Sequence, residues 1–280
     1  MSDIISVLVV DDSAYNRQTF KNILKKEEGI EVVGVASNGM DAMGKVLRLR
    51  PDLITLDFEM PEMDGMTFLR WLMSEAPTRV LMVSSHSDSA TVFKALELGA
   101  MDFVVKPTSR ASLELKNIER DLIEKVRGVR EMNMEVLSKN LKKIEKKSRR
   151  KAKRAKIKTD ISVLAIGSST GGPSALQMIL TEIPSDIPCA IVISQHMPRG
   201  FTAPLASRLD TLCSIKVKEA QSSESVLPGT AYICPGGNHM SFSRYGEDIK
   251  INLIESKEDD KYTPSVDEMM SSAANTFPVK

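Results

Sequence analysis

The first half of the chain alternates between two patterns of hydrophobic positions. Short apolar runs of strand type are separated by stretches in which apolar residues recur every three to four positions, as in an amphipathic helix. The strand-type runs are residues 5–10, 31–36, 52–57, 79–85 and 102–106. A fifth helix is expected after Pro107, carried by Leu115, Ile118, Leu122 and Val126. This alternation predicts an α/β fold, a flavodoxin-like (βα)5 doubly wound parallel sheet.

The second half starts the same pattern again. Residues 162–167 and 189–194 are apolar runs, and between them lies a turn rich in Gly, Ser and Thr, followed by a helical pattern. We predict a second doubly wound α/β domain here. Residues 139–158, between the two halves, hold twelve Lys or Arg and one Glu. The predicted organisation is therefore a first domain over 1–128, a basic linker over 129–160 and a second domain over 161–280.

The composition fits a globular protein of about two domains. The chain has 280 residues, of which 42% are hydrophobic, and domains typically have roughly 100–200 residues. It has no run of the ~20 apolar residues that a membrane span needs, and its N-terminus becomes acidic too soon for a secretory signal. Its three cysteines have spacings that suit neither a disulfide framework nor a zinc site. We expect a cytoplasmic protein with reduced thiols and no membrane insertion.

The basic segment leaves an alternative open. A run of cations can bind nucleic acid or an anionic membrane surface, and a DNA-binding output domain is the main rival to an enzyme. No helix-turn-helix pattern follows the segment, however, and DNA binding would leave the second domain unexplained. We therefore expect a solvated tether and no nucleic-acid partner.

Polar residues lie where the predicted strands of the first domain end. Asp11 and Asp12 close the first strand, Asp57 the third and Ser84 the fourth, and Lys106 follows the fifth. The carboxyl ends of parallel strands meet at one edge of a sheet. Carboxylates gathered there repel one another unless a cation joins them, and oxygen ligands favour Mg²⁺. A single Asp at a strand end often caps the next helix instead, but five suitable residues at five such places favour a site.

Four motifs within residues 4–128, namely VVDDS, LDFEMPEMDG, MVSS and VVKP, resemble the receiver domain of two-component response regulators. The resemblance implies that Asp57 accepts a phosphoryl group from a histidine kinase. It assigns Mg²⁺ to Asp11, Asp12, Asp57 and the backbone carbonyl of Glu59, and the phosphoryl oxygens to Ser84 and Lys106. Phe103 takes the position of the family's aromatic switch, although an ordinary core aromatic fits its spacing equally well.

The turn GSSTGGPS, residues 167–174, is of a kind that serves phosphates or nucleophiles. Pro173 stands where a Walker A loop needs lysine, and Ser169 stands where a dinucleotide fingerprint needs its second glycine. What remains is GxSxG centred on Ser169 rather than Ser168, with small neighbours that let the serine oxygen protrude. A plain capping turn is the alternative. Of the three histidines, His196 follows the next apolar run and reaches the same sheet edge, so we predict that it is the base.

Five segments of the second half carry a further resemblance: AIGSSTGGPSAL, ISQHMPRGFTAPLASRLD, VKEAQ, LPGTAYICPGGNHM and PSVDEMM. They are similar to the catalytic domain of the chemotaxis protein-glutamate methylesterase family, whose order is receiver, linker, esterase. The resemblance implies that Ser169 is the nucleophile and His196 its general base, with Thr170 beside the nucleophile and no cofactor. The implied substrates are glutamyl methyl esters and glutamines of methyl-accepting chemoreceptors, under control of receiver phosphorylation.

One element of the family pattern is not found. The family's triad aspartate lies in a GMGxDG segment beyond PSVD, and the chain reaches Lys280 without such a segment. Asp260 and Asp267 are near in sequence but do not match that motif, so neither is assigned the role. We therefore expect a second domain whose C-terminal part is missing, with weak or no activity in this chain. The alternative function is a receiver-controlled binding or DNA-binding module with an inactive, truncated esterase domain.

Overall fold

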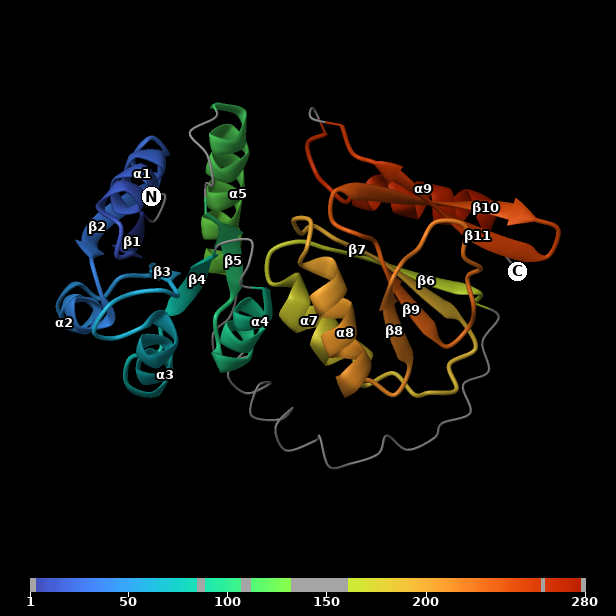
Figure 1. Ribbon diagram of the computed structural model, residues 1–280, viewed down its shortest axis with the longest axis horizontal. Helices are drawn as coiled ribbons and strands as arrows, with labels where there is room; N and C mark the ends of the chain where they lie inside the picture. Colours follow the sequence, from blue (N-terminus) through green and yellow to red (C-terminus); the bar gives the residue numbers. More distant parts are fainter. Residues whose placement is uncertain (1–3, 85–88, 107–111, 132–160, 258–259, 278–280) are drawn as a thin grey trace. The chain divides into compact units, whose positions relative to one another are not determined.

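The computed structural model describes residues 4–84, 89–106, 112–131, 161–257 and 260–277. The chain divides into two compact units, Met1–Lys143 and Ile144–Lys280 (Figure 1). Most of the predicted basic linker, from residue 132 to 160, lies outside the described residues. Within the described ranges, no helix combines the length and apolar character needed to cross a membrane.

Five parallel strands form the sheet of the first unit, in the order β2-β1-β3-β4-β5. The strands are β1 (Ile5–Val10), β2 (Ile30–Ala36), β3 (Leu53–Asp57), β4 (Arg79–Ser84) and β5 (Asp102–Val105). The helices are α1 (Ala14–Lys25), α2 (Gly39–Leu49), α3 (Gly65–Glu75), α4 (Ser89–Leu98) and α5 (Ser112–Glu131). This confirms the predicted flavodoxin-like (βα)5 fold.

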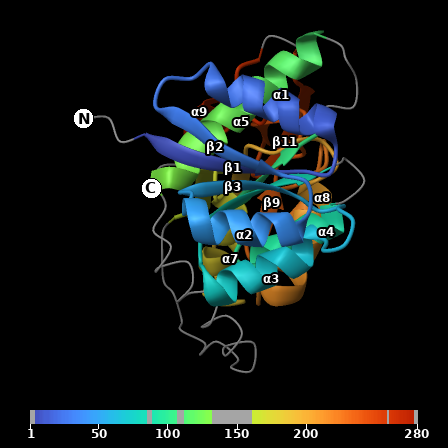
Figure 2. The same cartoon turned by 90° about the vertical axis from the view of Figure 1, so that its left-hand side faces the viewer.

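Helices cover both faces of this sheet. Figure 2 shows α1 and α5 on one face and α2 and α3 on the other. Under α1 and α5, a core is formed by Phe20 and Leu24 of α1 and by Leu122 and Val126 of α5, packed against β1. Each of these side chains is at most 1% exposed, and burying such a side chain stabilises the fold by about 1.5–3 kcal/mol. Their helical spacing is the pattern that predicted the two helices.

The strand-end aspartates of the first unit do not cap the helices that follow them. Ser13 caps α1, its Oγ accepting from the Asn16 N–H at 3.4 Å. Asp64 caps α3, its Oδ1 accepting from the Thr67 N–H at 2.7 Å. The N-cap positions after β1 and β3 are therefore occupied by Ser13 and Asp64, and not by Asp11 or Asp57.

The second unit contains a parallel sheet of four strands in the order β6-β7-β9-β8. These strands are β6 (Val163–Ser168), β7 (Ala190–Gln195), β8 (Lys216–Glu219) and β9 (Thr230–Ile233). The helices are α7 (Gly172–Leu180), α8 (Thr202–Leu212) and α9 (Val266–Thr276). An antiparallel hairpin joins β10 (Asn238–Tyr245) to β11 (Asp248–Glu255).

Both faces of the second sheet are covered. Helices α7 and α8 lie together on one face, whereas α9 and the hairpin lie on the other (Figure 1). The core on the hairpin side joins Val192 and Tyr232 of the sheet to Ile251 of the hairpin and Met269 of α9. The predicted doubly wound arrangement is confirmed for the parallel strands. The antiparallel hairpin is an addition to the predicted doubly wound arrangement.

The three cysteines carry free thiols. Cys189 and Cys234 are buried and Cys213 is partly buried. Burial raises the pKa of Cys213 to about 11 and that of Cys234 to about 12, with nearby carboxylates adding to each shift. These two thiols therefore stay protonated and unreactive at neutral pH, as expected for reduced core cysteines.

Candidate functional sites

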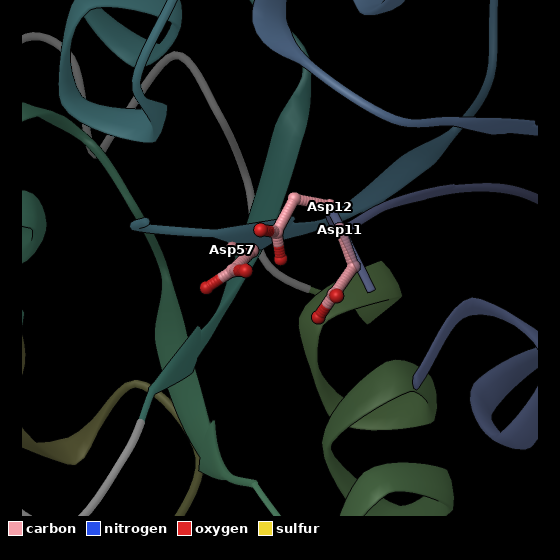
Figure 3. A group of neighbouring side chains, drawn as sticks. All are labelled: Asp11, Asp12 and Asp57. Atoms are coloured by element: carbon pink, nitrogen blue, oxygen red, sulfur yellow. The ribbon is translucent and has the colours of Figure 1, made fainter. Parts of the chain in front are cut away.

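Three aspartates gather at the carboxyl edge of the first sheet. Asp11 and Asp12 directly follow β1, and Asp57 is the last residue of β3, which neighbours β1. Figure 3 shows their carboxylates close together, and one oxygen of each lies within 4.8 Å of the others. Asp11 and Asp57 are buried, with 1% and 2% exposure, whereas Asp12 is exposed. The predicted acidic cluster therefore exists as a cluster in space.

Lys106 reaches this cluster from the residue after β5. Its Nζ lies 2.6 Å from Oδ2 of Asp57 and 3.4 Å from Oδ2 of Asp11. The lysine is thus a direct counter-ion for the two buried carboxylates, and the structure brings together four of the residues that the sequence placed at separate strand ends.

The backbone around the aspartates is held by polar contacts. Arg17 donates from Nη1 to the carbonyl oxygens of Asp11, at 2.6 Å, and of Asp12, at 2.8 Å. The Ser13 N–H donates to Oδ1 of Asp11 at 2.8 Å. On the other side, a Cβ added to Gly65 would lie 2.0 Å from the carbonyl oxygen of Asp57. Only glycine can begin α3 so close to β3, and this approach fixes the backbone of Asp57.

The electrostatics of the cluster are dominated by burial. Burial raises the pKa of Asp57 to about 6; the charge of Asp11 adds to the shift and Lys106 opposes it. Burial likewise raises the pKa of Asp11, again against the effect of Lys106. For Lys106, burial alone would lower the pKa, but the hydrogen bond to Asp57 and the charge of Asp11 more than offset it, so the pKa is raised. The positive charge of Lys106 therefore does not fully offset the effect of burial on the ionised Asp57 carboxylate.

Other predicted residues of the first unit are placed with less detail. Ser84 is the last residue of β4, and its side chain lies outside the described part. The Glu59 N–H donates to Oδ1 of Asp57 at 3.3 Å, which puts the Glu59 backbone beside the cluster. Phe103 is buried, its carbonyl accepts from Nζ of Lys125 at 2.6 Å, and that Nζ lies 5.0 Å from the centre of its ring.

Ser169 and His196 meet at the carboxyl edge of the second sheet. They follow the neighbouring parallel strands β6 and β7, whose last pair in register is Ser168 with Gln195. Oγ of Ser169 lies 3.4 Å from Nδ1 of His196. The turn after Ser169 is closed by the Gly172 N–H, which donates to the Ser169 carbonyl at 2.8 Å as α7 begins. The structure thus brings together the serine and histidine that the sequence paired.

Ser168 has a different environment from Ser169. Its hydroxyl donates to Oε1 of Gln195 at 2.6 Å, inside the sheet edge. The same amide donates from Nε2 to the carbonyl oxygens of Ser169, at 2.9 Å, and of His196, at 3.1 Å. Ser168 is therefore engaged with a buried amide, and Ser169 is the serine whose hydroxyl faces His196.

A loop that precedes α9 covers one side of His196. The Tyr262 ring meets the His196 ring edge-on, with centroids 5.6 Å apart and planes at 88°. His239 holds this loop: its Nε2 lies 2.8 Å from Oδ2 of Asp260, and its Nδ1 accepts from the Ser265 N–H at 3.0 Å. The hydrogen bond from His239 lowers the pKa of Asp260. Asp260 thus pairs with His239, which agrees with leaving it unassigned as a partner of His196.

Comparisons with known proteins match a different family model to each half of the chain. The family model described as CheB methylesterase matches residues 164–279, and that described as response regulator receiver domain matches residues 7–117. A protein-glutamate methylesterase/protein-glutamine glutaminase of Geobacter sulfurreducens is 42% identical over 291 aligned positions, covering 98% of this chain and 78% of that protein. The chain belongs to the CheB methylesterase family. The family resemblance inferred from the sequence is confirmed.

Solved CheB structures are similar to each half of the chain. The response regulator domain of CheB from Thermotoga maritima is 42% identical, covers 46% of this chain and 98% of its own, and has a TM-score of 0.44. The CheB methylesterase catalytic domain from the same organism is 40% identical, covers 42% of this chain and 62% of its own, and has a TM-score of 0.40.

Two residues beside Ser169 and His196 were missed in the sequence. Gln195 precedes His196 in the sequence. It could have been noticed as a polar residue at the end of an apolar run, a run of six residues that are all buried in the structure. Tyr262 gave no signal, because its contact with His196 spans 66 positions and depends on the folding of the hairpin and the following loop.

Proposed function

We propose that the protein is a phosphorylation-regulated hydrolase of bacterial chemotaxis that demethylates glutamyl methyl esters and deamidates glutamines of methyl-accepting chemoreceptors. The observation that carries the proposal is the 3.4 Å approach of Ser169 Oγ to His196 Nδ1. It lies within the region that the CheB methylesterase model covers. Serine–histidine pairs that tighten on substrate binding are a recurrent device of acyl transfer.

In the proposed reaction, Ser169 Oγ attacks the γ-carbonyl carbon of the methyl ester while His196 takes the hydroxyl proton. The Oγ–carbon bond forms, the carbon–methoxy bond breaks, and His196 returns the proton so that methanol leaves. Water then attacks the acyl-enzyme, and glutamate is released. From glutamine, the same acyl-enzyme forms with loss of ammonia. The N-terminus of α7, which begins three residues after Ser169, contributes partial positive charge near the developing oxyanion.

The first unit is proposed to receive the phosphoryl group on Asp57 from a histidine kinase. Three carboxylates with oxygens within 4.8 Å of one another, two of them buried and with raised pKa, are a donor set that fits a hard divalent cation. Asp11, Asp12, Asp57 and the Glu59 carbonyl would hold Mg²⁺, which supplies positive charge to the phosphoryl oxygens. Lys106 adds a second positive group from the end of β5, and Ser84 is proposed to contact the same oxygens.

The organisation proposed for this function keeps the predicted boundaries: a receiver over 1–128, a tether over 129–160 and a methylesterase domain over 161–280. The proposed partners are the kinase and the chemoreceptors, with no nucleic acid, and the proposed location is the cytoplasm. The esterase reaction as written needs no cofactor, because serine, histidine and water supply every proton and oxygen.

The proposal is tested by methanol release from membranes that carry methylated chemoreceptors. Ser169→Ala removes the nucleophile and His196→Ala removes its base, so each should lower the rate by about 10³-fold or more, because such groups act as a unit. Ser174→Ala is the matched control: it removes a hydroxyl from the first turn of α7, and the rate should stay at the wild-type level. Undiminished methanol release in Ser169→Ala would overturn the proposal.

A further inference from the structure

A buried amide joins the two loops of the serine–histidine site. Gln195 is the last residue of β7 and is 1% exposed. Burying an amide whose polar atoms lack hydrogen-bond partners destabilises a fold. Here Oε1 accepts from Ser168 Oγ at 2.6 Å, and Nε2 donates to the Ser169 carbonyl at 2.9 Å and to the His196 carbonyl at 3.1 Å. The side chain uses both of its N–H groups on the two residues that are to react.

The position of these bonds matters because the sheet ends here. The paired register of β6 and β7 stops at Ser168 and Gln195, and one further backbone bond runs from the His196 N–H to the Ser168 carbonyl at 2.8 Å. Ser169 and His196 each lie one residue beyond the last paired residue of their strand. Their carbonyls accept hydrogen bonds from Nε2 of Gln195 instead of from a neighbouring strand. From this geometry we infer that Gln195 is a positioning residue that sets the distance between the Ser169 hydroxyl and the His196 ring.

The orientation of the amide is fixed by its neighbours. Both carbonyls are acceptors, so they require the NH₂ side of the amide, whereas the Ser168 hydroxyl can donate to the oxygen side. A rotated amide would set its oxygen against two carbonyl oxygens. Ser168 is thus a support for Gln195, which gives this serine a role beside the nucleophile without making it one.

Space for the amide depends on the start of α7. A Cβ added to Gly172 would lie 1.9 Å from Oε1 of Gln195. The same glycine closes the Ser169 turn through its N–H. Gly172, the last glycine of GSSTGG, therefore serves two purposes, a backbone hydrogen bond and room for Gln195, and neither of them involves a phosphate.

The inference rests on the proposed function, because it gives Gln195 a role in that reaction. Well-oriented groups account for much of the rate in such sites, and a misplacement of about 1 Å can cost about 10²-fold. Loss of the amide removes one hydrogen bond from the carbonyl of Ser169 and one from that of His196, whether or not substrate is bound. The expected signature is a lower kcat with an almost unchanged KM.

The test compares two substitutions of Gln195 in the full chain. Gln195→Met keeps the length of the side chain and removes every hydrogen bond, and Gln195→Glu keeps its shape but sets carboxylate oxygens against the two carbonyls. We expect kcat for methanol release to fall by about 30–100-fold in both, with KM changed by less than about threefold. Ser168→Ala, which removes only the support of the amide, should lower kcat by about 3–10-fold and keeps the test open where a Gln195 variant does not fold.

Tyr232→Phe serves as the control for a purely structural effect. The Tyr232 hydroxyl accepts from the Leu227 N–H and donates to the Ser225 carbonyl, each at 3.0 Å, so this change also removes buried bonds to backbone. Its kcat should stay at the wild-type value. Wild-type kcat in the folded Gln195 variants and in Ser168→Ala, or an equal loss in Tyr232→Phe, would overturn the inference.

A second readout separates this inference from the proposed function. A fluorophosphonate probe reacts with an activated serine without any receptor, so its rate of labelling measures Ser169 directly. Labelling should be absent in Ser169→Ala and slowed by about 30–100-fold in Gln195→Met. If Ser169→Ala is inactive while Gln195→Met labels at the wild-type rate, the proposed function stands and the positioning role is wrong. If Ser169→Ala still releases methanol, the proposed function itself is wrong.

Discussion

The acidic site of the first unit and the serine–histidine site of the second occupy the same place in their folds but are assembled by opposite means. Both lie at the carboxyl ends of neighbouring parallel strands. In the first, buried charges face one another, and Asp57 is held with its pKa raised to about 6. In the second, hydrogen bonds from the Gln195 amide and from the Gly172 N–H hold the carbonyl of Ser169.

The difference between the two sites lies in what the surrounding structure controls: the pKa of a carboxylate in the first, and the separation of two side chains in the second. In the first site burial raises the pKa of Asp57, so that a bound cation or a phosphoryl group there would change the free energy of unfolding as well as the reactivity of the carboxylate. In the second site, on our proposal, the Gln195 amide binds the carbonyls of Ser169 and His196 and so controls the separation between these two side chains. Substitutions in the first should therefore change stability together with pH and metal dependence, and those in the second should change rate alone.

The largest expected effect is on phosphorylation, which should require Asp57 of the first site and should not require Ser169 of the second. Asp57→Asn should abolish phosphorylation by acetyl phosphate, because the carboxylate nucleophile is lost, and chelation of Mg²⁺ should abolish it in the wild type. Intact-mass spectrometry under conditions that preserve acyl phosphates measures the label. Ser169→Ala is the matched control and should be phosphorylated normally. Phosphorylation should also raise methanol release by the wild type and not by Asp57→Asn. Label that survives Asp57→Asn would remove Asp57 from its proposed role.

The next effect concerns stability. The pKa of Asp57 is about 6 in the folded state and 3.8 as its ordinary value, so the folded state binds the proton more tightly. The ionised carboxylate therefore costs stability, a cost that grows as pH rises from about 4 to about 6 and is complete above that. Without Mg²⁺, Asp57→Asn should raise the free energy of unfolding by about 2–3 kcal/mol at pH 7.5.

Urea unfolding at pH 7.5 and pH 4.5, with and without Mg²⁺, measures this effect. The gain should shrink markedly at pH 4.5 and should also shrink when Mg²⁺ is added. A gain that is constant with pH would show that burial of the Asp57 charge is not its source, and the contrast drawn between the two sites would lose its basis.

The smallest expected effect sharpens the second half of the contrast. Tyr262 is 43% exposed, and its ring meets the His196 ring edge-on. Tyr262→Ala should lower kcat for methanol release by about 3–10-fold, because the His196 imidazole loses the ring that packs against one side of it. The free energy of unfolding should show no comparable change. Tyr262→Phe keeps the ring and should restore the rate to within about twofold. A deficit in Tyr262→Phe equal to that in Tyr262→Ala would point to the hydroxyl instead of the ring.

The sequence predicted what depends on periodicity and strand ends. Five apolar runs indicated the first sheet, and the residues that close them indicated the acidic cluster, since parallel strands release their ends at one edge. The pairing of β10 with β11 was not predicted, because most positions of these two strands are half-buried or exposed and form no continuous buried run. The pairing of Asp260 with His239 depends on a loop folding back over 21 positions. No local pattern specifies that.

The close approach of Gly65 to the Asp57 carbonyl has a consequence for how freely sequences of this family can drift. Gly44, inside α2, has no atom within 4 Å of the place where a Cβ would stand, so alanine there should be accepted and should favour the helix by about 0.5–1 kcal/mol. At Gly65 even one methyl group collides with backbone that cannot move without displacing Asp57. A saturation library scored by Asp57 phosphorylation should tolerate many residues at position 44 and only the parental one at position 65.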